Sequence, residues 1–146
     1  MMGTKTGTWF EVGVRHPQTR EDGTEKKVTD RFLVNALSFT EAEAIAIQHQ
    51  SNYSTDFAIT SESQTSYNEL ILTDKENTLF FKAKIAFITI NEKTQKEKVT
   101  KMQYLVEAST ISEALHNVDE ALKGTMDYRV CSITETRIIE IIEKEK

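Results

Sequence analysis

Two glutamates are the candidates for chemistry that this sequence offers. Glu69 lies in "TSYNELIL" and Glu140 in "TRIIEIIE", at matching places in two similar segments. Two carboxylates that face each other could exchange protons with a substrate or hold a cation. The plainer interpretation, which we favour, is that both glutamates are solvent-facing residues on the last strand of a repeated unit.

No other pattern of catalytic or metal-binding residues is present. The chain lacks G-x-x-x-x-G-K-[ST], H-E-x-x-H, C-x-x-C and G-x-S-x-G. His16, His49 and His116 do not lie at ligand spacing from one another or from Cys131, and each is expected on a helix surface or in a loop. Cys131 is expected to be a small, half-buried strand residue. We therefore predict a protein that is not an enzyme and has no cofactor and no metal.

The composition allows a core but argues against general attraction to polyanions. The chain has 146 residues, of which 38% are hydrophobic and 28% charged, and its formal net charge is −5. This suits one compact domain, or two small halves that share a core. Negative net charge disfavours bulk attraction to nucleic acid or to an anionic membrane, although a local basic patch remains compatible with it.

The single cysteine and the terminal sequence indicate the compartment. One cysteine excludes an internal disulfide and fits a reducing environment. The N-terminal "MMGTKTGT" lacks the apolar stretch of a signal peptide, and no run approaches the length of a membrane span. We expect a cytoplasmic protein with no membrane partner.

The sequence segments that should form the elements carrying these residues occur twice in the chain. "FLVNALSFTEA" returns as "YLVEASTISEA", and the similarity extends over both halves. The offset is 71 residues at Trp9 and Phe80, 72 at Phe32 and Tyr104, and 71 again after the helix. At 71, "KVT" of the first copy lies on "KVT" of the second, so the extra residue of the second copy is expected near Lys101, as a β-bulge.

Each copy contains the same series of elements. Alternating apolar residues predict a strand, a polar hairpin and a second strand, and a helix and one or two further strands follow. The fold class is therefore α+β, a tandem duplication of a β-β-α-β(-β) unit with antiparallel sheet, two helices and a pseudo-two-fold axis. The repeats span residues 9–72 and 79–143, and we expect them to pack as one compact domain.

The helix starts carry the clearest local signal. Ser38 with Glu41, and Thr110 with Glu113, fit the capping box S/T-x-x-E. Gly124 follows the apolar stripe of the second helix and predicts its end.

Charge is distributed unevenly along the chain. Residues 15–31 carry a net charge of +1 and residues 82–101 a net charge of +4, which leaves −10 for all other residues. Aromatic residues share the outer face of the same hairpins, and cations beside exposed rings suit nucleotides or single-stranded nucleic acid. The predicted ligand-binding residues are Trp9, Arg15, Arg20, Lys27, Arg31, Phe80, Lys82, Lys84, Lys98 and Lys101.

Two functions follow as hypotheses. The first is a non-catalytic binding protein for single-stranded nucleic acid or a nucleotide, held by the basic hairpins and the outer-face aromatics. The alternative is a protein-interaction or oligomeric assembly subunit, in which exposed strand edges and the apolar "RIIEII" recruit a partner or a second copy. A plainer interpretation of the lysines, as solvated protection of the strand edges with buried aromatics, also fits the pattern.

Several phrases also carry a resemblance. "WFEVGVR", "VTDRFLVNALSFTEAEA", "KAKIAFITINEKTQKEKVT" and "LKGTMDYRVCSITETRI" resemble, in order and spacing, a domain-of-unknown-function family found in gut bacteria and their phages. The resemblance covers nearly the whole chain. It implies a small stand-alone protein, and it brings no known activity or functional residues.

Overall fold

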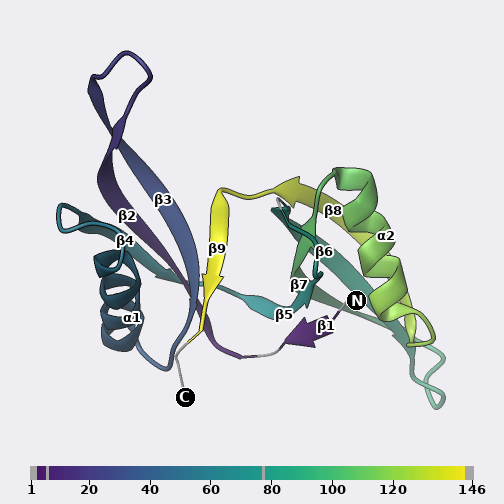
Figure 1. Cartoon of the computed structure of the whole chain (residues 1–146). Coiled ribbons are helices and arrows are strands. Elements are labelled where there is room, and N and C mark those ends of the chain that lie inside the picture. The colour runs from purple at the N-terminus through teal and green to yellow at the C-terminus, as the bar shows by residue number, and fades with distance from the viewer. Residues whose placement is uncertain (1–2, 6, 77, 144–146) are drawn as a thin grey trace. The chain divides into compact units, whose positions relative to one another are not determined.

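Two helices and nine strands make up the described part of the chain. The computed structural model describes residues 3–5, 7–76 and 78–143 (Figure 1). The elements are, in chain order, β1 (Gly3–Lys5), β2 (Trp9–Thr19), β3 (Glu25–Asn35), α1 (Phe39–Ser51), β4 (Ala58–Gln64), β5 (Tyr67–Leu72), β6 (Leu79–Ile90), β7 (Glu97–Ala108), α2 (Ile111–Leu122), β8 (Asp127–Glu135) and β9 (Ile138–Ile142). The α+β class and the repeated order of elements are as predicted, and β1 is a strand that the sequence pattern did not indicate.

The strands form two sheets in two compact units. One sheet has the order β4-β2-β3-β9 and the other β1-β5-β7-β6-β8. We call the first compact unit, Thr8–Ser66 with Arg137–Lys146, the N-unit, and the second, Met1–Gly7 with Tyr67–Thr136, the C-unit. Helix α1 packs on the sheet of the N-unit and α2 on that of the C-unit (Figure 1).

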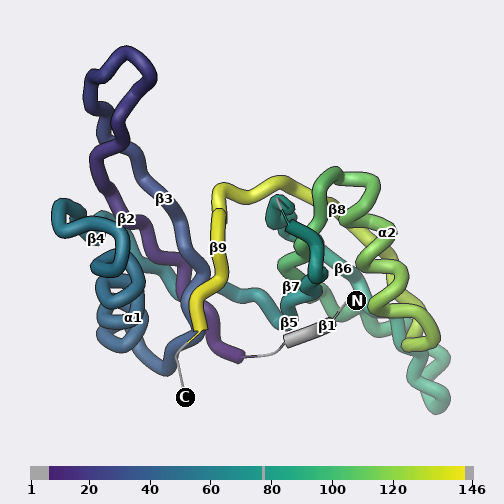
Figure 2. The backbone as a smooth tube through the Cα atoms, in the orientation of Figure 1, coloured from purple at the N-terminus to yellow at the C-terminus, as the bar shows by residue number. Residues whose placement is uncertain are grey.

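The last strand of each repeat pairs in the sheet of the other repeat. Strand β5 pairs with β7, and β9 pairs with β3. Figure 2 shows the path: the chain passes from β4 into β5, and later from β8 into β9 beside β3. Both pairings are parallel, so the expectation of purely antiparallel sheet is wrong, and each sheet is mixed. The compact units therefore have other boundaries than the repeats 9–72 and 79–143; that these pack as one compact domain stays a prediction.

The two copies agree in the details of their pairing. The register between β2 and β4 shifts at Gly13, and that between β6 and β8 shifts at Lys84, 71 residues later. Thr65 donates its backbone N–H and its hydroxyl to the carbonyl of Trp9, at 2.9 and 2.8 Å. Thr136 makes the same two bonds to the carbonyl of Phe80, at 2.9 and 2.8 Å. Shared irregularities of this kind support duplication more strongly than shared strands do.

The extra residue of the second copy lies in a hairpin loop. Strands β6 and β7 pair without a break from Leu79 with Ala108 to Ile90 with Glu97, so the β-bulge expected near Lys101 is wrong. The connection spans residues 20–24 in the first copy and 91–96 in the second. A surface loop accepts an added residue at little cost, whereas a shift inside the strand would turn its core side chains outward.

The two hairpin turns differ, as their sequences predict. Gly23 takes a φ of 86°, and Arg20 and Thr24 close that loop through a 2.8 Å backbone hydrogen bond. In the second hairpin Gln95 takes the left-handed conformation, with a φ of 60°, without a glycine. The side-chain oxygen of Asn91 accepts there from the N–H of Lys93, at 2.9 Å.

The predicted helix boundaries are confirmed. The hydroxyls of Ser38 and Thr110 each accept from the backbone N–H three residues later, both at 3.1 Å. Helix α2 ends at Leu122, and Gly124 takes a φ of 80°, the conformation that ends helices and favours glycine. These signals are local in sequence, which is why the sequence alone located them.

Each unit has its own hydrophobic cluster between helix and sheet. In the N-unit, α1 contributes Ala42 and Ala46 and the exchanged strand contributes Ile142. In the C-unit, α2 contributes Ala114, Val118 and Leu122, and β5 contributes Ile71. Burial of apolar surface is the main stabilising contribution in such clusters, so each exchanged strand helps to form the core of the unit it joins.

Candidate functional site

Four basic side chains share one face of the sheet in the C-unit. Lys82 and Lys84 alternate on β6, and the next residue of the same face, Ala86, pairs with Lys101 of β7 and with Arg129 of β8. Paired residues of neighbouring strands point to the same side, so the four cations lie on the face opposite to α2. Lys84, Lys101 and Arg129 are exposed and Lys82 is half-buried. We call these four residues the cationic face.

The cationic face also holds polar, apolar and acidic side chains, and the buried Leu105 pairs with Lys82. Gln103 and Ser132 pair with Lys84, and Thr134 pairs with Lys82, so they point to the same side. Asp127 and Glu97 lie on this face nearer to the hairpin end, as partners of Ile88 and Ile90. Glu107 lies on the same face at the other end, as the partner of Phe80. The four cations therefore face three acids, and these acids lie towards both ends of the face.

The N-unit does not repeat this arrangement. The positions equivalent to the four cations hold Glu11, Gly13, Thr29 and Ala58. The predicted residues Arg15, Lys27 and Arg31 do share one face of the β2–β3 hairpin, through their partners Thr29, Pro17 and Gly13. Arg31 lies 3.8 Å from the carboxylate of Glu11, and Arg20 is exposed in the hairpin loop.

The two predicted aromatic residues do not offer exposed rings. Trp9 is 1% exposed and Phe80 is 6% exposed. The expectation of outer-face aromatics that stack on bases is therefore wrong, because a base cannot reach a ring that is already covered. The Trp9 Nε1 atom is buried and has no hydrogen-bond partner among the described residues.

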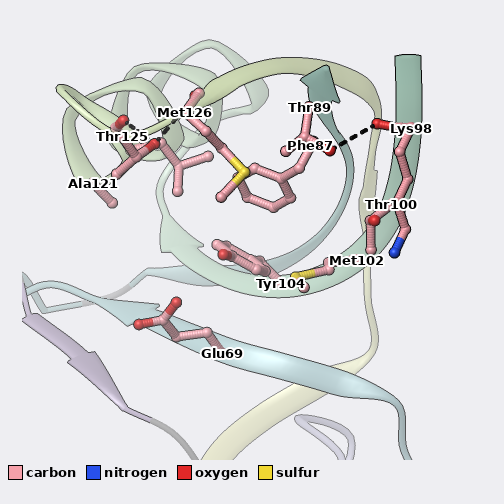
Figure 3. A pocket seen from close by; sticks show the side chains of 11 residues that line it. Glu69, Phe87, Thr89, Lys98, Thr100, Met102, Tyr104, Ala121, Thr125 and Met126 are labelled. Atoms are coloured by element: carbon pink, nitrogen blue, oxygen red, sulfur yellow. Dashed lines mark hydrogen bonds between the residues drawn. The ribbon is translucent and has the colours of Figure 1, made fainter. Parts of the chain in front are cut away.

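A cavity of about 570 Å³ lies in the C-unit, between the sheet and the end of α2. Figure 3 shows the side chains around it, with Glu69 on one side and Lys98 and Thr100 on the other. Such a volume suits a small organic ligand. The predicted residue Lys98 belongs here and not to the cationic face, because it pairs with Thr89 on the other side of the hairpin. The lining residues are Glu69, Phe87, Thr89, Lys98, Thr100, Met102, Tyr104, Ala121, Leu122, Thr125 and Met126.

The cavity wall combines apolar side chains with one carboxylate. Phe87 and Tyr104 are nearly buried, and their ring centroids lie 6.2 Å apart. Burial raises the pKa of the Tyr104 phenol, and the nearby charge and hydrogen bonding of Glu69 raise it further. Glu69 is half-buried and Glu140 is exposed, so the plainer interpretation of solvent-facing residues is wrong for Glu69 and correct for Glu140.

Two histidines of the N-unit form specific pairs. His16 bonds to the carboxylate of Asp30 at 2.5 Å, and this hydrogen bond raises the pKa of the imidazole. His49 Nε2 lies 2.6 Å from the carboxylate of Glu140. The expectation of surface histidines fails for both, since their side chains are 19% and 21% exposed. Their partners come from other strands, so sequence spacing could not indicate them.

The structure also places Cys131 and the apolar segment "RIIEII". Cys131 is exposed and not half-buried, because it is the unpaired residue where β8 shifts register beside β6. The apolar segment "RIIEII" is largely β9, and its Ile138 and Ile142 side chains are buried in the N-unit, while β9 itself stands at the end of its sheet. Ile139 of this segment is 55% exposed.

The described residues contain neither a cluster of metal ligands nor a helix that could span a membrane. Within residues 3–5, 7–76 and 78–143, no three histidine, cysteine or acidic side chains gather as metal ligands would. Neither α1 nor α2 has the length and apolar character needed to cross a bilayer.

The residues missed at the sequence level are Arg129 and most of the cavity wall. Arg129 could have been placed by extending the alternation of the hairpin into the next strand. The cavity had a subtler signal: the helix position that holds His49 in the first copy holds Ala121 in the second, so the second copy has less side chain to fill the same space.

The fold and these surfaces define a duplicated α+β protein whose C-unit has both a cationic face and a cavity. The chain belongs to the family described as "Domain of unknown function (DUF4494)", whose model matches residues 8–144. No curated protein and no solved structure matches the chain.

Proposed function

We propose that the chain is a non-catalytic binding protein whose C-unit binds single-stranded nucleic acid through its phosphates. The observation that carries the proposal is that Lys82, Lys84, Lys101 and Arg129 gather on one sheet face. Ammonium and guanidinium groups neutralise phosphates, and the release of condensed counterions favours binding. We infer further that the protein acts in the cytoplasm, from its single cysteine and terminal sequence, and that it comes from a gut bacterium or one of its phages, from the resemblance noted in the sequence.

The proposed binding depends on the charge of the nucleic acid and not on its base sequence. Trp9 and Phe80 are buried, so they do not supply stacking surfaces. The hydroxyls of Ser132 and Thr134 and the guanidinium of Arg129 flank the lysines and are suited to phosphate and sugar contacts. A single nucleotide carries fewer phosphates than a strand and should bind more weakly to the same residues.

Fluorescence anisotropy of a labelled oligothymidylate tests the proposal. If four phosphates are neutralised, the association constant should fall about 50-fold between roughly 50 and 200 mM salt, from a slope of about −0.7 per phosphate. Lys84→Glu with Lys101→Glu should abolish binding at low salt. Arg15→Glu with Lys27→Glu is the matched control, since it changes the charge equally on the hairpin of the N-unit, and it should have a small effect.

Two results would contradict the proposal. One is affinity that does not depend on salt, and the other is an equal loss of binding in both double variants, which would indicate attraction to the whole chain and not to the cationic face.

The alternative function, an assembly subunit, is supported by the edge strands. Strands β4 and β9 stand at the ends of one sheet and β1 and β8 at the ends of the other, and each pairs on one side within the described chain. Unpaired strand edges can add a strand from another protein. Light scattering over a range of concentrations separates the two functions, because assembly predicts a mass above that of one chain.

A further inference from the structure

The cavity of the C-unit has a counterpart in the N-unit. Glu69 pairs with Tyr104 on neighbouring parallel strands, and Glu140 pairs with Phe32 in the same way. On the helices, Ala121 and His49 both lie eleven residues after their N-caps, so they hold the same position over the sheet. The same site can therefore be compared in the two units, with His49 over the sheet in the N-unit and Ala121 in the C-unit.

In the N-unit, a side chain of the protein occupies this site. The imidazole of His49 reaches Glu140, with Nε2 at 2.6 Å from the carboxylate. Its ring stands edge-on to Phe32, with centroids 5.3 Å apart, and lies 5.4 Å from the ring of Tyr53. A nitrogen heterocycle that can carry positive charge thus fits between the carboxylate and the aromatic ring.

In the C-unit, no helix side chain reaches Glu69, and the Tyr104 hydroxyl, which Phe32 lacks, interacts with this carboxylate beside an open cavity. Ala121 ends at its Cβ atom, while the carboxylate of Glu69 and the ring of Tyr104 are retained, and all three line the cavity of about 570 Å³. The hairpin wall also changes: His16 and Asp30 of the N-unit correspond to Phe87 and Met102 here. A polar hydrogen-bonded pair is replaced by two apolar side chains, which favours a ligand with an apolar body.

We propose that this cavity binds a small organic cation, an amine or imidazole on an aromatic body, with its N–H group on Glu69. The site is distinct from the cationic face, which lies on the other side of the β6–β7 hairpin. A carboxylate beside apolar walls attracts a cation more strongly than one in water does. The rings of Tyr104 and Phe87 also favour a cation or the edge of an aromatic ring.

The distribution of charge around the cavity orients the ligand. Lys98 and Thr100 lie across the cavity from Glu69 (Figure 3). The ammonium of Lys98 disfavours a second cation at that end, so the charged nitrogen of the ligand points to Glu69. The aromatic body then lies along Phe87, Met102 and Met126, where thioether sulfur contacts with rings are favourable.

Isothermal titration calorimetry of the full chain tests the proposal with three probes of one shape. Tryptamine, indole and indole-3-acetate share a ring and differ in charge, as cation, neutral molecule and anion. We expect tryptamine to bind roughly tenfold more tightly than indole and indole-3-acetate to bind most weakly. The ¹³C-methyl signals of Met102 and Met126 should shift with tryptamine and place it in the cavity.

Two variants separate the parts of the site. Glu69→Gln should remove the preference for tryptamine over indole and leave the affinity for indole unchanged. Ala121→His should weaken tryptamine binding at least tenfold, because the new imidazole would take the place that His49 holds in the N-unit. Ala44→His, at an exposed position of α1, is the matched control and should leave binding unchanged.

The proposal is overturned if indole-3-acetate binds as tightly as tryptamine, if Glu69→Gln keeps the order of the three probes, or if no probe binds. The Glu69 variant decides the matter even if Ala121→His does not fold. Lys84→Glu with Lys101→Glu should leave tryptamine binding intact, so a failure of nucleic-acid binding and a failure of this proposal are distinguishable.

Discussion

The partly buried carboxyl of Glu62 destabilises the folded N-unit when it is ionised. Glu62 pairs with Val12 and so points to the helix side of the sheet, where the C-unit has the partly buried Ile133 packed against its core. Burial raises the pKa of its carboxyl, and the charge of Glu43 raises it further. Its Oε1 atom is buried and has no hydrogen-bond partner among the described residues. The ionised carboxylate therefore opposes folding at neutral pH.

We predict that Glu62→Gln stabilises the protein at pH 7, with an unfolding midpoint higher by roughly 2 °C. Because the folded state raises the pKa, the stabilising effect of the Glu62 proton is present below the ordinary value near 4.5 and is lost as the pH rises through the raised value. The gap between variant and parent should thus close near pH 4. Glu43→Gln should give a smaller gain, and an equal midpoint at pH 7 for parent and Glu62→Gln would contradict the prediction.

For single residues of the candidate site, the sequence predicted the exposure of the cations but not the burial of the aromatic rings. Among the predicted cations of the C-unit, Lys84, Lys98 and Lys101 are exposed. The aromatic partners were misjudged because alternation assigns a side chain to a face of the sheet but does not state whether that face is covered. Trp9 and Phe80 lie at covered positions.

At the scale of elements, two threonines attach the third strand of each copy to the first. Thr65 binds the carbonyl of Trp9 and Thr136 that of Phe80, with near-identical distances. We predict that Thr65→Val and Thr136→Val each lower the free energy of unfolding by about 1 kcal/mol, the usual loss for one hydroxyl hydrogen bond. Denaturant unfolding measures both. Thr134→Val, an exposed threonine of β8, is the control, and effects of clearly different size at the two equivalent sites would contradict the prediction.

Elements with local signals were predicted well, and register was not. The capped helices and the Gly124 stop follow from contacts within a few residues, which the sequence states directly. The extra residue was misplaced because "KVT" matches "KVT" at an offset of 71, whereas the hairpin pairs these strands at 72. Exposed strand residues constrain register weakly, and the buried Phe32 and Tyr104 decide it.

At the scale of the whole molecule, the exchange of β5 and β9 links each unit to the other half of the sequence. Ile142 packs in the cluster of the N-unit and Ile71, its equivalent, in that of the C-unit. We predict that Ile142→Ala destabilises β2 and β3 and that Ile71→Ala destabilises β6 and β7, each by roughly 2–4 kcal/mol. Amide hydrogen exchange resolved by residue measures this.

The outcome is specific because each substitution lies in one repeat, whereas the strands that it should destabilise belong to the other repeat. Ile139→Ala, at an exposed position of β9, controls for effects on the strand itself and should change little. Faster exchange in β6 and β7 of the Ile142 variant, with β2 and β3 unchanged, would show that β9 does not belong to the sheet of the N-unit.

The sequence by itself determined the duplication, the order of elements, the capped helices and the presence of basic hairpins, because each of these is written in local pattern or in self-similarity. Only the tertiary structure decided that the last strands change sheets, that Arg129 joins Lys84 and Lys101, and that Ala121 leaves open what His49 fills. These depend on contacts between residues far apart in the chain. The stability of such contacts comes from the fit of whole faces, which no short stretch of sequence records.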